Sequence, residues 1–119
     1  MTDTTTLNRG EWRTELDRVT ENHEGEEVTI EVMDPELGPG YEAERLPFAY
    51  IDYDPKDDVV VIGVGGRTSR YPVVLRHLVY QPSTVDIAES DVPVPAVRVV
   101  EPDGTTTLVR FFTEASHLA

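Results

Sequence analysis

Four cationic side chains, Arg67, Arg70, Arg76 and His77, are the strongest candidates for chemistry in this sequence. They lie in one short stretch of a chain that is otherwise strongly acidic. Arginine forms bidentate hydrogen bonds with carboxylates and phosphates, so the cluster predicts a binding site for an anionic small molecule. The alternative is that each cation pairs with one of the many acids of the surface, an arrangement that contributes little free energy.

Other patterns of catalysis or metal binding are incomplete. Asp52, Asp54 and Asp58 have the spacing of three calcium ligands, but the turn glycine and the closing glutamate of such a loop are missing. The glycines of 63–66 follow a strand without the rest of a nucleotide-binding fingerprint. His23 is expected in the last turn of a helix, where a cation complements the helix dipole. We therefore predict no catalytic residue, no metal site and no cofactor.

The charge of the chain disfavours two classes of partner. Ten Lys and Arg residues against 23 Asp and Glu residues give a net charge of −13, which repels nucleic acids and anionic membranes. No apolar run is long enough to span a membrane and no signal peptide is recognisable, so we expect a cytoplasmic protein. Lys56 is the single lysine among these ten basic residues, which leaves open a coding bias towards arginine or an adaptation to high salt.

An amphipathic helix is predicted from Asn8 to about residue 24, before the strands described next. Asn8 and Glu11 have the spacing of a capping box, and Gly25 can end the helix in a left-handed conformation. The apolar stripe of this helix consists of Trp12, Leu16 and Val19, whose spacing requires a larger surface to pack against.

About six short strands follow, because apolar residues alternate along most of the remaining chain. The strands are expected at 28–32, 46–53, 59–64, 71–80, 85–87 and 106–112, with Val97 and Val99 leading into the last hairpin. Residues 34–40 contain two prolines and two glycines, so a mobile loop without ladder hydrogen bonds is expected there. Gly63, Gly65 and Gly66 are expected to bend the sheet.

These elements predict one α+β domain over residues 1–119. Its N-terminal amphipathic helix should pack on a strongly bent antiparallel sheet or a small, partly open β-barrel. The ordered core is expected at about 8–112, and the tails 1–6 and 114–119 are expected to be mobile because they contain few apolar residues.

Several short motifs follow one another along this chain in a recognisable order. They are Trp12-Arg13, Leu16-Asp17, His23, Gly25, 28–32, Leu46-Pro47, 51–54, 77–82 and 103–111. This order resembles a family of small, acidic bacterial proteins known only as a domain of unknown function. The resemblance implies the element boundaries given above, and it implies no activity, cofactor or binding residue.

A helix followed by bent strands is also loosely similar to Sm-type small barrels. In those barrels a segment like residues 50–62 forms the second and third strands, and the resemblance would imply ring assembly and RNA binding. This chain lacks a basic, glycine-containing RNA pocket motif, and its charge of −13 opposes RNA, so the resemblance extends only to the architecture.

We predict a non-enzymatic binding or protein-interaction module that forms a homo-oligomer or binds a protein partner through an edge strand or the glycine-rich bend. Nucleic acid and membrane are not expected as partners. The alternative is a small-molecule enzyme or sensor that binds an anionic ligand at Arg67, Arg70, Arg76 and His77.

Overall fold

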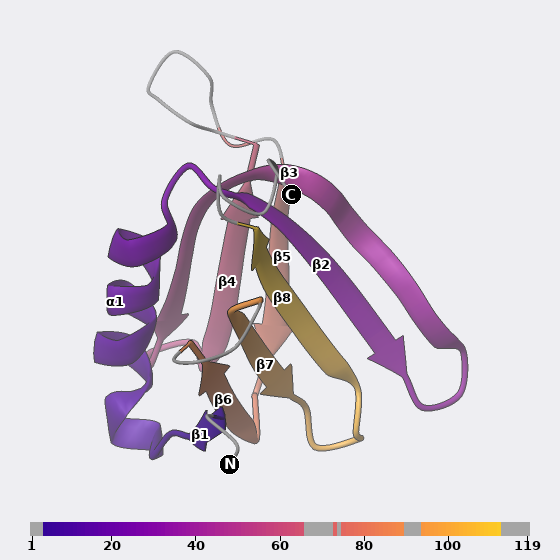
Figure 1. Ribbon diagram of the computed structural model, residues 1–119. Coiled ribbons are helices and arrows are strands. Elements are labelled where there is room, and N and C mark those ends of the chain that lie inside the picture. The colour runs from indigo at the N-terminus through magenta and orange to yellow at the C-terminus, as the bar shows by residue number, and fades with distance from the viewer. Residues whose placement is uncertain (1–3, 66–72, 74, 90–93, 113–119) are drawn as a thin grey trace.

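The computed structural model describes residues 4–65, 73, 75–89 and 94–112 and contains one α-helix and eight strands (Figure 1). The helix α1 spans Trp12–His23 and follows a short 3-10 turn, η1, at Arg9–Glu11. The strands are β1 (Thr4–Thr6), β2 (Glu27–Asp34), β3 (Gly38–Asp54), β4 (Val59–Val64), β5 (Leu75–Tyr80), β6 (Thr84–Ala88), β7 (Ala96–Val100) and β8 (Thr106–Phe112). No helix of the described chain is long and apolar enough to cross a membrane.

The predicted helix is confirmed together with the signals at both of its ends. The backbone N–H of Asn8 donates to Glu11 Oε1 at 3.1 Å, which is one half of the capping box. Trp12, Leu16 and Val19 are buried, as the apolar stripe predicts. Gly25 ends the helix with φ at +89°, a left-handed conformation that a glycine adopts without steric cost.

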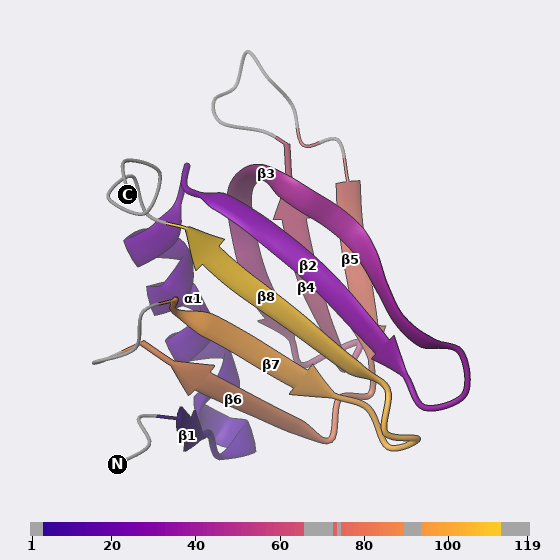
Figure 2. The same cartoon turned by 45° about the vertical axis from the view of Figure 1, so that its right-hand side comes forward.

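All eight strands belong to one antiparallel sheet with the order β1-β6-β7-β8-β2-β3-β4-β5 (Figure 2). The two end strands, β1 and β5, do not pair with each other in the described chain, so the sheet is open. The predicted α+β class is confirmed, with an N-terminal helix packed on an antiparallel sheet. The described sheet is neither closed nor strongly curled, so the expected strong bend or partly open barrel is not seen. The predicted number of about six strands is too low, partly because β1 lies in the segment expected to be a mobile tail.

The long strand β3 changes its partner halfway along its length. Its first half pairs with β2 as far as Glu27↔Pro47, and its second half pairs with β4 from Phe48↔Val64 onward. A register shift between Phe48 and Tyr50 accompanies the change. The sheet is thus redirected at β3 and not at the predicted glycine bend, where Gly63 sits within the ladders to both β3 and β5.

Gly63 instead allows the close approach of an aromatic ring. A Cβ atom at this position would lie 2.5 Å from Cε2 of Tyr50, closer than side-chain atoms approach each other. The ring of Tyr50 therefore lies over a glycine that has no side chain to displace it. Gly66 lies outside the described residues.

The predicted mobile loop at 34–40 is wrong, because most of these residues are paired. Asp34 pairs with Gly38 and Met33 pairs with Pro39, which confines the turn to residues 35–37. Asp34 Oδ1 accepts the backbone N–H groups of Glu36 and Leu37 and so fixes that turn. Proline is tolerated here because the first half of β3 has no strand on its other side in the described chain.

The predicted tails can be compared with the structure at one end only. Thr4–Thr6 forms β1, which pairs with Asp86, Ile87 and Ala88 of β6, so the expectation of a mobile tail is wrong for these three residues. Residues 113–119 lie outside the described residues.

Helix α1 covers the second half of β3 and completes the core (Figure 1). The hydroxyl of Thr20 donates to the backbone oxygen of Ile51 and accepts its N–H, both at 2.9 Å. A helix side chain thus satisfies the backbone groups that another strand would otherwise pair. The core between the helix and the sheet includes Trp12, Phe48 and Phe111, all nearly inaccessible to solvent.

Candidate functional site

The structure describes half of the predicted cationic cluster and places its two residues on opposite faces of β5. Arg76 Nε donates to the hydroxyl oxygen of Tyr50 at 2.9 Å, and His77 Nε2 lies 3.2 Å from Oγ1 of Thr107. Neighbouring residues of a strand point to opposite sides, so one ligand cannot contact both side chains on one face. Arg67 and Arg70 lie outside the described residues, and the four-residue site stays a prediction.

His77 lies on the inner side of β5 and faces Thr107 of β8, where burial lowers the pKa of its imidazole below the ordinary 6.5. The negative charge of Glu42 opposes this effect in part. A neutral imidazole beside the Thr107 hydroxyl is typical of a satisfied histidine between packed elements.

The outer face of β5 carries an exposed apolar surface that the sequence analysis did not identify. Leu78 is 43% exposed and Tyr80 is 57% exposed. Leu78 pairs with Val61 of β4, and Arg76 pairs with Gly63, over which the ring of Tyr50 lies. We call this surface, made by Tyr50, Val61, Arg76, Leu78 and Tyr80, the β5 face.

The β5 face lies at the end of the sheet. No strand of the described chain pairs with the outer edge of β5. The strand contains Arg76 and His77 and no acid, although the whole chain has a net charge of −13. An uncovered edge beside exposed apolar side chains is the usual place for a further strand to bind.

A second candidate is a surface hollow of about 650 Å³ at the start of α1. Its lining consists of Arg9, Gly10, Arg13 and Thr14 from the N-terminal segment and Tyr53, Pro55 and Asp58 from the β3–β4 hairpin. Two arginines in a hollow of this size would suit an anionic ligand.

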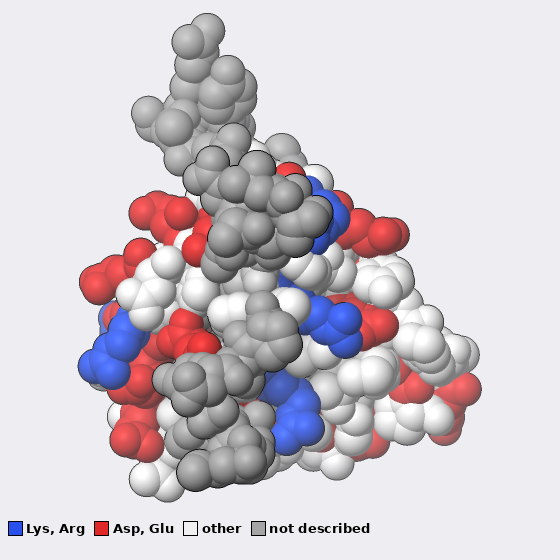
Figure 3. Space-filling view, in the orientation of Figure 1, with Lys and Arg blue, Asp and Glu red and all other residues white. Residues whose placement is uncertain are grey.

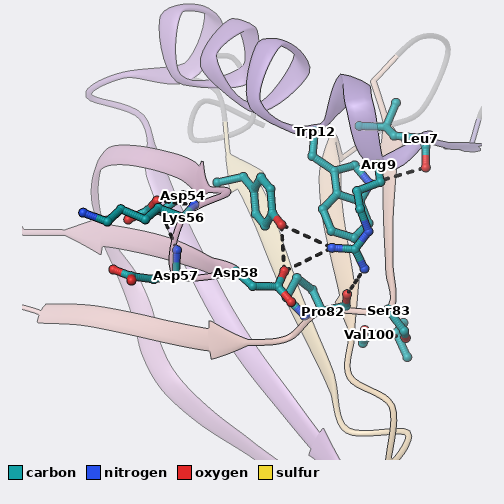
Figure 4. Close-up of polar contacts among 11 residues, drawn as sticks. Leu7, Arg9, Trp12, Asp54, Lys56, Asp57, Asp58, Pro82, Ser83 and Val100 are labelled. Carbon is teal, nitrogen blue, oxygen red and sulfur yellow. Dashed lines mark hydrogen bonds and ion pairs between the residues drawn. The ribbon is translucent and has the colours of Figure 1, made fainter.

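The contacts of Arg9 argue against that interpretation (Figure 4). Its guanidinium donates to the Tyr53 hydroxyl at 3.2 Å, to Asp58 Oδ1 at 3.1 Å and to the backbone oxygen of Pro82 at 3.2 Å. It also lies 4.4 Å from the centre of the Trp12 ring. Arg9 therefore ties the N-terminal segment to two loops of the sheet, and we call these five residues the Arg9 cluster.

One acid, Asp58, lines the hollow, and the carboxylates of Asp17 and Asp52 lie close to Arg13. Burial, followed by the hydrogen bond to Asp58, raises the pKa of Tyr53 above its ordinary value. Burial and then the charge of Asp17 raise the pKa of the neighbouring Asp52, whereas Arg13 lowers it. Carboxylates around the hollow compete with any anionic ligand, so the Arg9 cluster is best explained as a structural contact.

His23 is the third polar centre. Its Nδ1 lies 2.8 Å from Glu26 Oε1, and its Nε2 contacts Glu89. The ring stacks on Phe111 with the ring centres 4.3 Å apart. Both ring nitrogens thus contact carboxylates, and the side chain joins the end of α1 to the end of β6. No group of His, Asp or Glu in the described chain is arranged to hold a metal.

Sequence reasoning missed the Arg9 cluster because its members are far apart in the chain. Arg9 and Asp58 are 49 positions apart, and no motif links them. The β5 face had a signal in the sequence. Leu78 and Tyr80 alternate with His77 and Val79, so apolar side chains lie on both faces of this strand. If one face packs in the core, the other exposes its apolar side chains to solvent.

Comparisons with known proteins identify relatives and no activity. The model of a family of unknown function, DUF5335, matches residues 3–118. An uncharacterised protein of the bacterium Aquifex aeolicus (strain VF5) is 31% identical over 107 residues, which cover 90% of each chain. No solved structure matches the chain. The resemblance seen in the sequence is thereby confirmed, and the chain belongs to the family of unknown function DUF5335.

Proposed function

We propose that this protein is a non-enzymatic interaction module that associates with a second copy of itself through β5. The observation that carries the proposal is an edge strand with two exposed large apolar residues, Leu78 and Tyr80, and no acid. Such a strand offers both backbone hydrogen bonds and apolar area to an added strand.

The sequence of β5 is self-complementary in the antiparallel direction. If two copies of the strand pair about Leu78, each Leu78 lies opposite the same residue of the second copy. Arg76 then lies opposite Tyr80 of the second copy, and the reverse contact forms as well. Apolar cross-strand pairs contribute about 0.2–1 kcal/mol each, and an Arg over a Tyr ring contributes about 0.5–1 kcal/mol at an exposed site.

Electrostatics favours β5 over other surfaces for contact between two copies. Each copy has a net charge of −13, so the copies repel each other at long range. Close approach is least unfavourable where the contacting strand has no carboxylate, as in β5. Salt screens the repulsion and leaves the apolar contact, so self-association should become stronger as the salt concentration rises.

Sedimentation-velocity centrifugation over a range of protein concentrations tests the proposal. We expect the wild type to dimerise, Leu78→Asp to be monomeric, and Leu37→Asp to dimerise like the wild type. Leu37 is the matched control because it is also an exposed leucine, and its replacement changes the net charge equally. A wild type that stays monomeric throughout, or equal behaviour of both variants, would refute self-association through β5.

The small-anion alternative has no geometric support from its described members, because Arg76 already contacts Tyr50 and His77 points to the other face. The four-residue site remains a prediction, because Arg67 and Arg70 lie outside the described residues. A thermal-shift screen with phosphorylated and carboxylated metabolites tests it, and Arg70→Gln should abolish any stabilisation found.

A further inference from the structure

The hairpin formed by β2 and β3 carries the other exposed apolar side chains of the described chain. Leu37 at its turn is 88% exposed, Tyr41 is 58% exposed and Met33 is 38% exposed. The turn lies at the far end of the two strands and projects from the sheet (Figures 1 and 2). We call residues 31–44 the hairpin arm.

Two of these side chains lie on one continuous face. Met33 pairs with Pro39 and Glu31 pairs with Tyr41, so all four residues are on the same side of the hairpin. Glu31 also pairs with Leu108 of β8, which extends this face towards the centre of the sheet. The neighbouring residues Ile30 and Val109 point to the core. Figure 3 shows this side of the molecule, with uncharged surface on the right bordered by acidic groups.

The charge of the hairpin arm has one sign. It contains Glu31, Asp34, Glu36, Glu42 and Glu44 and no Lys, Arg or His. Glu31 lies 3.9 Å from Arg110, and Asp34 is engaged in the turn. Glu36, Glu42 and Glu44 are exposed, and no Lys or Arg of the described chain forms an ion pair with them. The charge of Glu42 acts on His77 of β5, which leaves Glu36 and Glu44 for a partner. The arginines around this face already have acidic partners: Arg45 pairs with Glu27, Arg98 with Asp86 and Arg110 with Glu31.

The geometry favours contact with the face of the arm and disfavours pairing with its edge. The β2–β3 ladder has register shifts between Val28 and Ile30 and between Ile30 and Glu31, and Arg45 has φ at +55°. Irregularities of this kind disturb the row of backbone groups that an added strand would need. A second copy is also a poor occupant, because it presents the same acidic arm.

We propose that the hairpin arm docks a basic polypeptide segment that carries large apolar side chains. Apolar side chains of the partner cover Met33 and Tyr41 beside the protruding Leu37, and its Arg or Lys residues pair with Glu36 and Glu44. This interaction is independent of self-association through β5, since it uses a different surface and a partner of opposite charge.

Fluorescence anisotropy with a labelled synthetic peptide of equal numbers of Arg and Leu residues tests the charge requirement. The double variant Glu36→Gln, Glu44→Gln should bind about tenfold more weakly than the wild type. The control Glu21→Gln, Glu24→Gln removes the same number of charges from exposed positions elsewhere and should bind like the wild type. Equal losses in both variants would show attraction to net charge alone, and no binding by the wild type would also overturn the proposal.

The apolar requirement has its own test with the same peptide. Leu37→Ser combined with Tyr41→Ser should weaken binding about tenfold, whereas Leu78→Ser combined with Tyr80→Ser, on the β5 face, should not. Amide chemical shifts of the wild type should change mainly within residues 31–44 on titration. Unchanged affinity of the first variant, or shift changes spread over the acidic surface, would exclude docking on the hairpin arm.

Discussion

The Arg9 cluster and the β5 face both contain an arginine bonded to a tyrosine hydroxyl, yet the two regions differ in almost every other respect. Arg9 has three acceptors and an indole beneath it, and its partner Tyr53 is buried. Arg76 has Tyr50 as its hydrogen-bond partner in the described chain, and exposed apolar residues lie beside it. The first arrangement holds the fold together, and the second leaves apolar side chains exposed on the β5 face. Residue type alone does not distinguish them; the burial of the partner and the number of acceptors do.

The largest difference between the two regions should appear when an aromatic ring is removed from each. Trp12→Ala deletes a side chain that is 2% exposed, and we expect it to lower the free energy of unfolding by about 3–5 kcal/mol. Tyr80→Ala on the β5 face should change it by less than about 0.5 kcal/mol. Urea unfolding followed by circular dichroism measures both values, at a protein concentration low enough to keep the chain monomeric. Similar losses of unfolding free energy in the two variants would mean that Tyr80 is packed and not exposed.

A smaller loss of unfolding free energy is expected at Gly63, which packs against Tyr50 of the β5 face. Gly63→Ala places a Cβ against the Tyr50 ring, and overpacking of this kind costs about 1–3 kcal/mol of unfolding free energy. The clash involves the ring of Tyr50, so Tyr50→Ala in the same chain should recover most of the loss. Failure of this rescue in urea unfolding would place the constraint in the backbone.

The two arginines themselves should differ by less. Arg9→Gln removes a donor to Asp58 and the contact with Trp12, and we expect a loss of about 1–2 kcal/mol in unfolding free energy. Arg76→Gln should cost less than about 0.5 kcal/mol, because its surroundings are exposed. A double-mutant cycle of Arg9→Gln with Asp58→Asn should give a coupling energy above the error of the method. A coupling of zero would exclude Arg9 as a structural contact.

The smallest effect concerns how the unfolding free energy depends on pH through His77, on the inner side of β5. Burial lowers the pKa of His77 in the folded state, so the unfolded chain binds the proton more tightly. The contribution of His77 to stability is therefore complete above its ordinary pKa of 6.5 and is lost as the pH falls below that value. His77→Asn should flatten the dependence of unfolding free energy on pH in this window, whereas Arg76→Gln should not. An unchanged profile would contradict the assigned direction.

Local signals predicted the elements well. The strands expected at 59–64 and 106–112 have the same bounds as β4 and β8, and the signals at both ends of α1 are confirmed. Each of these depends on residues close together in sequence, such as Asn8 and Glu11. The strand expected at 71–80 begins at Leu75 in the structure. Its earlier residues are described in part only.

Non-local choices were not predictable in the same way. β3 pairs with β2 along its first half and with β4 along its second half. No pattern of neighbouring residues predicts this change of partner. Thr4–Thr6 has no apolar residue, and it forms a strand because β6 offers an edge. The cationic cluster was predicted from adjacency in sequence, and strand geometry separates Arg76 from His77.

The short strand β1 limits the addition of further strands at that end of the sheet. A dimer joined at β5 would place the two copies of β1 at the outer ends of a continuous sheet, and each has three residues in the part of the chain that the structure describes. So short a strand gives an incoming chain few backbone hydrogen bonds, and propagation into a filament has little to build on. Assembly through β5 would therefore close at two subunits.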